Sequence, residues 1–216
     1  MRIDNFNNLK PITIHNVYLL DSSGSMSTDN KYYACIEAIK EEVNKLKELY
    51  SNEIEYTFSL FTFDKIYSEF KDVLKLDFNK FRFNLPLSMT PLYDSIGNIL
   101  ERINENIKPE DRVIFTICTD GEENASKSEY KNLEYLQEAM SKYQKENNIT
   151  YTFIASSDDK DRIINTLNIP EGNIVTHNNT AESLINQINF KSEMLENYSN
   201  NTLRGMTIST SYFTGN

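Results

Sequence analysis

Five oxygen-bearing side chains, spread over three separate segments of the chain, could together hold a metal ion. Asp21, Ser23 and Ser25 lie within five residues of one another, Thr90 precedes a proline, and Asp120 follows a run of apolar residues. Carboxylates and hydroxyls are hard oxygen donors, and the set contains no thiol or imidazole. Such a set favours Mg²⁺, with Mn²⁺ and Ca²⁺ as alternatives, and argues against zinc and copper.

The charge of this set determines what a bound ion would do next. Gly24 permits a tight turn between Ser23 and Ser25, so that both hydroxyls can face the same point. Two carboxylates nearly neutralise a divalent cation, and hydroxyl groups donate to it only weakly. An octahedral ion held in this way keeps an open position that attracts one more anionic oxygen. The residues therefore predict a metal-mediated contact with a protein partner that presents an Asp or Glu side chain.

The elements around these residues should bring them to one edge of a sheet. Residues 12–20 form an apolar run that ends at Asp21, and residues 113–118, just before the second aspartate, form the most apolar run of the chain. Both runs are typical of strands that are buried on both faces. In open α/β sheets, ligand sites lie beyond the carboxyl ends of such strands, where the strand order reverses. Thr90 indicates a helix start and can serve as the N-cap, as a ligand, or as both.

The rest of the chain alternates between helical and strand patterns. We expect helices through residues 32–49, 92–103, 133–143, 163–167 and 181–198, and further strands at 56–63, 66–76, 151–155 and 173–176. The two strands at 56–63 and 66–76 are joined by a short turn and should pair antiparallel. The pattern predicts a three-layer α/β/α sandwich, Rossmann-like, with a mostly parallel central sheet and one antiparallel edge hairpin strand. We expect one domain over residues 1–200 and a tail over 201–216, either free or laid along the body.

The motif as a whole resembles the complete metal-ion-dependent adhesion site (MIDAS) of von Willebrand factor A (vWA) domains. That site combines Asp-x-Ser-x-Ser with a distant Thr and a later Asp, and the resemblance covers residues 12–200. It implies that Ser23, Ser25 and Thr90 contact the metal directly or nearly so. It also implies that Asp21 and Asp120 act directly or through water, and that the carboxylate of a partner completes the shell.

Two segments resemble one subgroup of vWA proteins in particular. Residues 89–94 and 119–126 resemble those of stand-alone intracellular vWA proteins of bacteria and phages, including the proteins of tellurite-resistance-type clusters. The family usually has Gly before the Thr, where this chain has Ser88 and Met89. This departure puts the shape of the second metal loop in question, but not its donor.

Composition excludes several other classes of function. The formal net charge is −10, so nucleic acid and anionic membrane surfaces are disfavoured as partners. The sequence shows no apolar signal core or membrane-spanning run, and its two cysteines make neither a zinc site nor a disulfide framework. We therefore expect a cytoplasmic protein. His15 and His177 are interpreted as structural, and Glu122 and Glu123 as solvated charges at the rim of the site.

The function predicted from these residues is a divalent-cation-dependent protein-binding module, without enzymatic activity, that acts as an intracellular scaffold or adaptor. One alternative is a metal-dependent hydrolase or phosphatase that uses the same acidic cleft. Against it, there is no second Asp two positions after Asp21, no Gly-x-Ser-x-Gly elbow, and no His beside Ser25. The other alternative is a structural component of a phage or mobile-element assembly.

Overall fold

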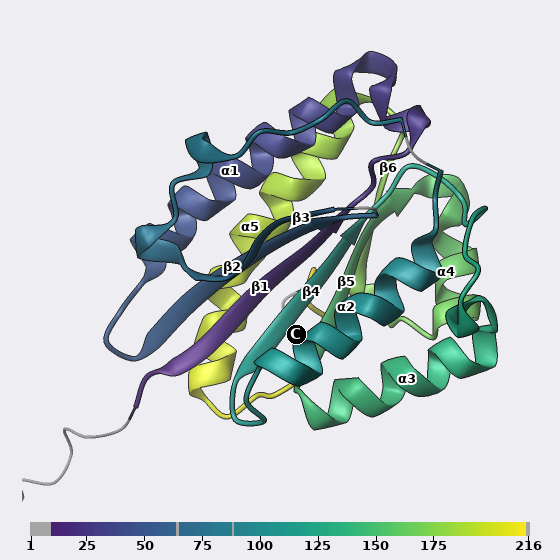
Figure 1. Ribbon diagram of the computed structural model, residues 1–216. Helices are drawn as coiled ribbons and strands as arrows, with labels where there is room; N and C mark the ends of the chain where they lie inside the picture. The colour runs from purple at the N-terminus through teal and green to yellow at the C-terminus, as the bar shows by residue number, and fades with distance from the viewer. Residues whose placement is uncertain (1–9, 64, 88, 215–216) are drawn as a thin grey trace, which may run out of the picture.

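The computed structural model describes residues 10–63, 65–87 and 89–214, and a six-stranded sheet forms its centre (Figure 1). The strands are β1 (Ile12–Leu20), β2 (Ile54–Thr62), β3 (Ile66–Asp72), β4 (Arg112–Cys118), β5 (Ile149–Ser156) and β6 (Ile174–His177). Their order across the sheet is β3-β2-β1-β4-β5-β6. Neighbouring strands run parallel except for β2 and β3, which form an antiparallel hairpin at one edge. This arrangement confirms the mostly parallel sheet with one antiparallel edge strand.

Helices cover both faces of the sheet. On one face lie α1 (Lys31–Leu49) and α5 (Ala181–Leu203), and on the other lie α2 (Leu92–Asn106), α3 (Leu133–Glu146) and α4 (Lys160–Leu167) (Figure 1). Successive strand residues point to opposite faces, so Tyr18 of β1 joins the core on the α1 side and Leu19 joins the core on the α2 side. Within the described residues, no helix is both long and apolar enough to cross a membrane. The result is the three-layer α/β/α sandwich.

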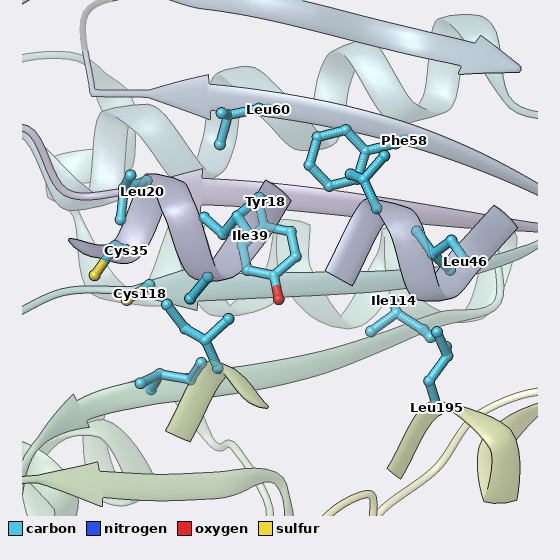
Figure 2. Packing of buried hydrophobic residues seen from close by; sticks show 14 of the residues in the cluster. Tyr18, Leu20, Cys35, Ile39, Leu46, Phe58, Leu60, Ile114, Cys118 and Leu195 are labelled. Carbon is cyan, nitrogen blue, oxygen red and sulfur yellow. The ribbon is translucent and has the colours of Figure 1, made fainter. Parts of the chain in front are cut away.

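The core between the sheet and the α1–α5 layer holds α1 in place. Figure 2 shows Tyr18 and Phe58 of the sheet, Ile39 and Leu46 of α1, and Leu195 of α5. None of these five side chains is exposed to solvent. Full burial of an aliphatic or Phe side chain contributes about 1.5–3 kcal/mol. This packing therefore fixes the position of α1 and, with it, the segment that joins β1 to α1.

Cys35 of α1 and Cys118 of β4 belong to the same core (Figure 2). Both thiols are free, and both side chains have no exposed surface. The contact with the Cys35 thiol, and after it burial, raise the pKa of Cys118 well above its usual range. Both residues therefore pack as small apolar side chains, as their sequence contexts predict.

β3, α2 and α5 are examples of elements whose ends differ from those that the sequence pattern suggests. β3 stops at Asp72, where the carboxylate accepts a hydrogen bond from the Leu74 N–H at 3.0 Å and a 3₁₀ turn begins. α2 begins at Leu92, one residue after the start that a cap at Thr90 would give. α5 continues five residues beyond Tyr198, because Tyr198 and Thr202 still face the core. Short 3₁₀ helices occupy Gly24–Asn30, Val73–Lys75, Phe78–Lys80, Glu129–Lys131, Ser157–Asp159 and Glu171–Asn173.

The segment that follows α5 lies along the body of the domain. Tyr212 and Phe213 are 3% and 6% exposed. The Tyr212 N–H donates to Asn173 Oδ1 at 2.8 Å, and its hydroxyl donates to the carbonyl of Lys191 at 3.1 Å. Of the two arrangements considered for the tail, its described part adopts the packed one. The division of the chain at residue 200 stays a prediction.

Candidate metal centre

The carboxyl ends of β1 and β4 lie side by side at the point where the strand order reverses. β1 continues into α1 on one face of the sheet, whereas β4 leads to α3 on the other face. The Asp21 N–H donates to the Cys118 carbonyl at 2.8 Å, which ties the two strand ends together. Asp21 and Asp120 therefore leave neighbouring strands at the edge where open α/β sheets place their ligand sites.

Asp21 is held rigidly at the base of this edge. Its side chain has no exposed surface. Oδ1 accepts the Ser23 N–H at 2.7 Å, and Oδ2 accepts the Thr119 hydroxyl at 2.7 Å. Burial raises the pKa of the Asp21 carboxyl, and the hydrogen bonds from Thr119 and Ser23 oppose that shift. The carboxylate is thus a fixed acceptor whose negative charge is poorly solvated, which suits a cation ligand.

Side-chain oxygens of Ser23, Ser25 and Asp120 form a continuous row. The two serine hydroxyl oxygens are 2.8 Å apart, and Ser25 Oγ donates to Asp120 Oδ1 at 2.6 Å. Adjacent ligands of an octahedral Mg²⁺, at 2.0–2.1 Å from the metal, are separated by about 3 Å. The observed spacing is close to that value, so these oxygens fit one shell of a small divalent cation.

Gly121 marks the point on which the three segments converge. A Cβ atom placed on Gly121 would lie 3.8 Å from Ser25 Oγ, 3.9 Å from Thr90 Oγ1 and 4.0 Å from Asp21 Oδ2. Donors separated by as many as 99 positions in the sequence therefore surround a single small region, which the missing side chain of Gly121 leaves open. All five residues predicted from the sequence lie in this cluster, and the donor set fits a hard divalent cation.

The cluster depends on hydroxyls as well as on carboxylates. Among the residues that the structure describes, no three His, Cys, Asp or Glu side chains form a group that could hold a metal ion. The two carboxylates of the cluster are supplemented by Ser23, Ser25 and Thr90. Because hydroxyl donors are neutral, they do not offset the positive charge of a divalent ion as carboxylates do.

Thr90 is fixed through its backbone to the Asp120 loop, which is residues 119–128 between β4 and the 3₁₀ helix Glu129–Lys131. The Thr90 N–H donates to Asn124 Oδ1 at 2.9 Å, and its carbonyl accepts the Asn124 N–H at 3.1 Å. The expectation that Thr90 caps the following helix is wrong, because α2 begins after Pro91. The first N–H groups of α2 are instead capped across space, by residues of the Asp120 loop. The Thr90 hydroxyl is thereby left to face the cluster.

Glu123 provides this cap and also stabilises its own loop. One carboxylate oxygen accepts the Tyr93 N–H at 3.0 Å and the Ser126 hydroxyl at 2.7 Å, and the other accepts the N–H groups of Ala125 and Ser126 at 2.8 and 2.7 Å. The Ser126 hydroxyl in turn accepts the Asp94 N–H at 3.0 Å. Interpreting Glu123 as a solvated rim charge is therefore wrong, whereas Glu122 is exposed as expected.

Lys31 is a residue of the site that sequence reasoning missed. It is the first residue of α1, and its Nζ donates to Asp120 Oδ2. The side chains of Lys31 and Asp120 are only 6% and 1% exposed. A lysine at a helix start is ordinarily solvated, so the sequence position itself carries no signal of burial.

Both histidines make structural contacts. His177 Nε2 lies 3.0 Å from the Thr119 carbonyl, and burial lowers the pKa of this imidazole. His15 lies 2.6 Å from Thr57 Oγ1 and 3.1 Å from Asp111 Oδ2. Burial alone would raise the pKa of Asp111, but the contacts with His15 and Lys108 together outweigh it and hold the pKa below the usual carboxyl value. These partners agree with a structural role for each histidine.

Comparison with known proteins finds similar folds but little similarity in sequence. No family model and no curated protein matches the sequence. Solved structures do match, each at low identity. The ArnB paralog VWA2 from Sulfolobus acidocaldarius is 18% identical (TM-score 0.56), and the match covers 85% of this chain and 45% of that one. Proximal thread matrix protein 1 from the mussel byssus, solved with a zinc-occupied MIDAS motif, is 15% identical (TM-score 0.59), with 83% and 47% covered.

A third match is the pilus adhesin SpaC from Lactobacillus rhamnosus GG in its open conformation, 11% identical with a TM-score of 0.62, covering 88% of this chain and 30% of that one. This chain thus spans less than half the length of each of the three proteins. Likeness at such identities concerns the fold alone. The fold is that of vWA domains.

Proposed function

We propose that this chain is a divalent-cation-dependent protein-binding module. In this proposal Asp21, Ser23, Ser25, Thr90 and Asp120 hold one Mg²⁺ ion, with Mn²⁺ or Ca²⁺ as alternatives, and an acidic side chain of a protein partner completes the shell. The observation that carries the proposal is the convergence of Ser25, Thr90 and Asp21 around the open position of Gly121. The zinc-occupied MIDAS motif of the mussel protein supports it, because a vWA fold there holds a divalent metal.

An apolar loop beside the cluster supports a protein as the partner. Leu85, Leu87 and Met89 are 66%, 80% and 63% exposed, and Met89 directly precedes Thr90. Leu85 and Leu87 also line a cavity of about 260 Å³ that reaches Ser22, in the turn of the first metal segment. Large apolar side chains gathered at a surface mark contact sites for other proteins. A lone anion would gain nothing from them.

We further propose that the module acts inside the cell as a scaffold or adaptor, and that it binds without turning over a substrate. The free thiols of Cys35 and Cys118 accord with a reducing compartment. The histidines support the binding role over hydrolysis, because His177 is hydrogen-bonded to a backbone carbonyl and His15 to Asp111, so neither is paired with a serine of the cluster as a general base. The kinship with stand-alone bacterial and phage vWA proteins, including those of tellurite-resistance clusters, belongs to the same proposal and rests on residues 89–94 and 119–126.

Metal binding is the first thing to test. Isothermal titration of the purified chain with MgCl₂ and MnCl₂ should show one saturable site, and Asp21→Ala should abolish it. Glu122→Ala is the matched control, because it removes an exposed carboxylate from the same edge without touching the cluster. Equal binding by the wild type and Asp21→Ala would contradict the assigned site.

Partner binding is tested next by passing a lysate of the native host over a column that carries the immobilised chain. A partner should be retained in Mg²⁺, released by EDTA, and absent from an Asp21→Ala column. A Leu87→Ser column should retain less of it while binding Mg²⁺ normally. Retention that survives both EDTA and Asp21→Ala would refute the metal-mediated contact.

A further inference from the structure

Lys31 places a buried positive charge against a proposed metal ligand. Its Nζ is bound to Asp120 Oδ2, while the other oxygen of the same carboxylate accepts the Ser25 hydroxyl at 2.6 Å. The ion pair is nearly closed to solvent, at 6% and 1% exposure. Solvent therefore screens it far less than the exposed pairs of the same protein, such as Lys75 with Asp72. A charge so placed acts on anything that binds to the cluster.

We infer that Lys31 sets the net charge of the cluster, so that the site binds its cation less tightly alone and more tightly together with an anionic ligand. This inference rests on the proposed function. Asp21, Asp120 and Lys31 leave the metal-free cluster with a single negative charge. A divalent cation converts that to a single positive charge, which the carboxylate of a partner then neutralises. Without Lys31, the metal-loaded cluster would already be neutral.

Lys31 also restricts how Asp120 can contribute. With Oδ2 held by the ammonium group, only Oδ1 faces the row of serine hydroxyls. Asp120 is therefore limited to a single oxygen toward the cation, either directly or through water. Weak donation from Asp120 leaves the cation more dependent on an external carboxylate. The charge effect and the geometric effect act in the same direction.

The size of the charge effect follows from Coulomb's law. Even at the dielectric constant of water, about 80, a unit positive charge about 6 Å from a divalent cation lowers its binding constant on the order of 10-fold, and a lower dielectric constant increases that factor. By thermodynamic reciprocity, an anion that improves cation binding is itself bound better when the cation is present. Lys31 thus strengthens the effect that an anionic ligand has on cation binding.

The test compares one substitution that removes the charge of Lys31 with one that keeps it. Lys31→Met keeps a long apolar stem and removes the ammonium group, whereas Lys31→Arg keeps the positive charge. Mn²⁺ affinity is measured for each by titration, without and with sodium acetate at constant ionic strength. In the wild type and Lys31→Arg, acetate should raise the apparent Mn²⁺ affinity. In Lys31→Met, Mn²⁺ should bind about 10-fold or more tightly, and the acetate effect should shrink toward none.

Controls separate this inference from the proposed function. Lys40→Met removes a lysine from the same helix that is ion-paired with the exposed Glu37, and it should behave as wild type. Thermal unfolding checks that each variant folds, and Lys31→Gln replaces Lys31→Met if the latter does not. Unchanged or weaker Mn²⁺ binding in the neutral variant, or equal behaviour of the arginine and neutral variants, overturns the inference. Absence of any Mn²⁺ binding by the wild type overturns the proposed function itself.

Discussion

The ammonium group of Lys191 on α5 is ion-paired with the carboxylate of Glu42 on α1, and neither side chain is exposed to solvent. Lys191 Nζ also donates to Asn16 Oδ1 at 3.1 Å and lies 4.6 Å from the centre of the Tyr18 ring. The Tyr18 hydroxyl donates to the second oxygen of Glu42. This buried network joins β1 to the two helices that cover it. Burial lowers the pKa of Lys191, against the charge of Glu42.

Lys191→Met should destabilise the protein severely, because the buried Glu42 carboxylate would lose its ion-pair partner. Breaking a buried ion pair from one side costs about 3–5 kcal/mol. Urea unfolding followed by circular dichroism measures the loss in unfolding free energy. The double variant Glu42→Gln with Lys191→Met should recover part of that loss, since it removes both charges. A single variant within about 1 kcal/mol of wild type would show that the pair is not desolvated as described.

Glu123→Ala should weaken metal binding even though Glu123 is not a proposed ligand. The substitution leaves the N–H groups of Tyr93, Ala125 and Ser126 without their acceptor, and so loosens the Thr90 loop from the Asp120 loop. Loss of residues that orient metal ligands typically lowers affinity 10- to 100-fold. Titration with Mn²⁺ checks this, alongside Glu122→Ala as the neighbouring control. Equal affinity in both variants would mean that the two loops hold their places without Glu123.

Gly121→Ala should weaken cation binding while leaving the stability of the fold nearly unchanged. The new methyl group would meet its nearest neighbours at 3.8–4.0 Å, an ordinary contact distance, so the unfolding free energy should stay within about 1 kcal/mol of wild type. The same methyl group fills the space among Ser25, Thr90 and Asp21, so cation affinity should fall on the order of 10-fold. Gly97→Ala gives the opposite contrast, because its Cβ would lie 2.2 Å from the Tyr130 ring. That variant should lose about 1–3 kcal/mol through overpacking.

Asp94 should contribute to the acid sensitivity of the fold. Partial burial alone would raise its pKa, but the N–H groups of Lys127 and Ser128 and the Ser128 hydroxyl outweigh this and hold the pKa below the ordinary value of 3.8. A carboxyl with a lowered folded-state pKa stabilises the fold above its unfolded pKa. That stabilisation is lost as the pH falls through the folded-state pKa. Asp94→Asn should therefore lose less stability than wild type below about pH 4.

Urea unfolding at several pH values between about 6 and 2 measures this difference. Glu122→Gln serves as the control for the loss of one exposed negative charge. If the unfolding free energies of the wild type and Asp94→Asn fell in parallel as the pH is lowered, Asp94 would not contribute to the acid sensitivity of the fold. A change shared by both variants would trace the effect to net charge instead.

The sequence was sufficient for the fold because its strands are buried on both faces. The runs before Asp21 and Asp120 are mostly apolar, with the buried His15, Asn16 and Thr116 among the exceptions. Such runs are typical of central parallel strands. The five oxygen donors could be grouped for the same reason, since parallel strands deliver their carboxyl ends to a common edge. Comparison with solved structures supports the vWA fold. The role of these donors as metal ligands stays a prediction.

Other parts of the site depend on contacts between residues far apart in the chain. Glu123 and Glu122 are identical in type and adjacent, yet one caps α2 across 30 positions of sequence and the other faces solvent. Lys31 lies 89 positions before its partner Asp120. No local pattern distinguishes these residues from ordinary surface charges, because their roles arise only when the loops meet.

The place of β4 beside β1 connects the cluster to the order in which the chain is synthesised. Asp21, Ser23 and Ser25 leave the ribosome early, whereas the strand that completes the surroundings of β1 ends only at Cys118. A nascent chain that lacks Asp120 cannot gather the full donor set. An ion would therefore bind here only after β1 and β4 have paired. It would stabilise the sheet once formed and would not initiate its folding.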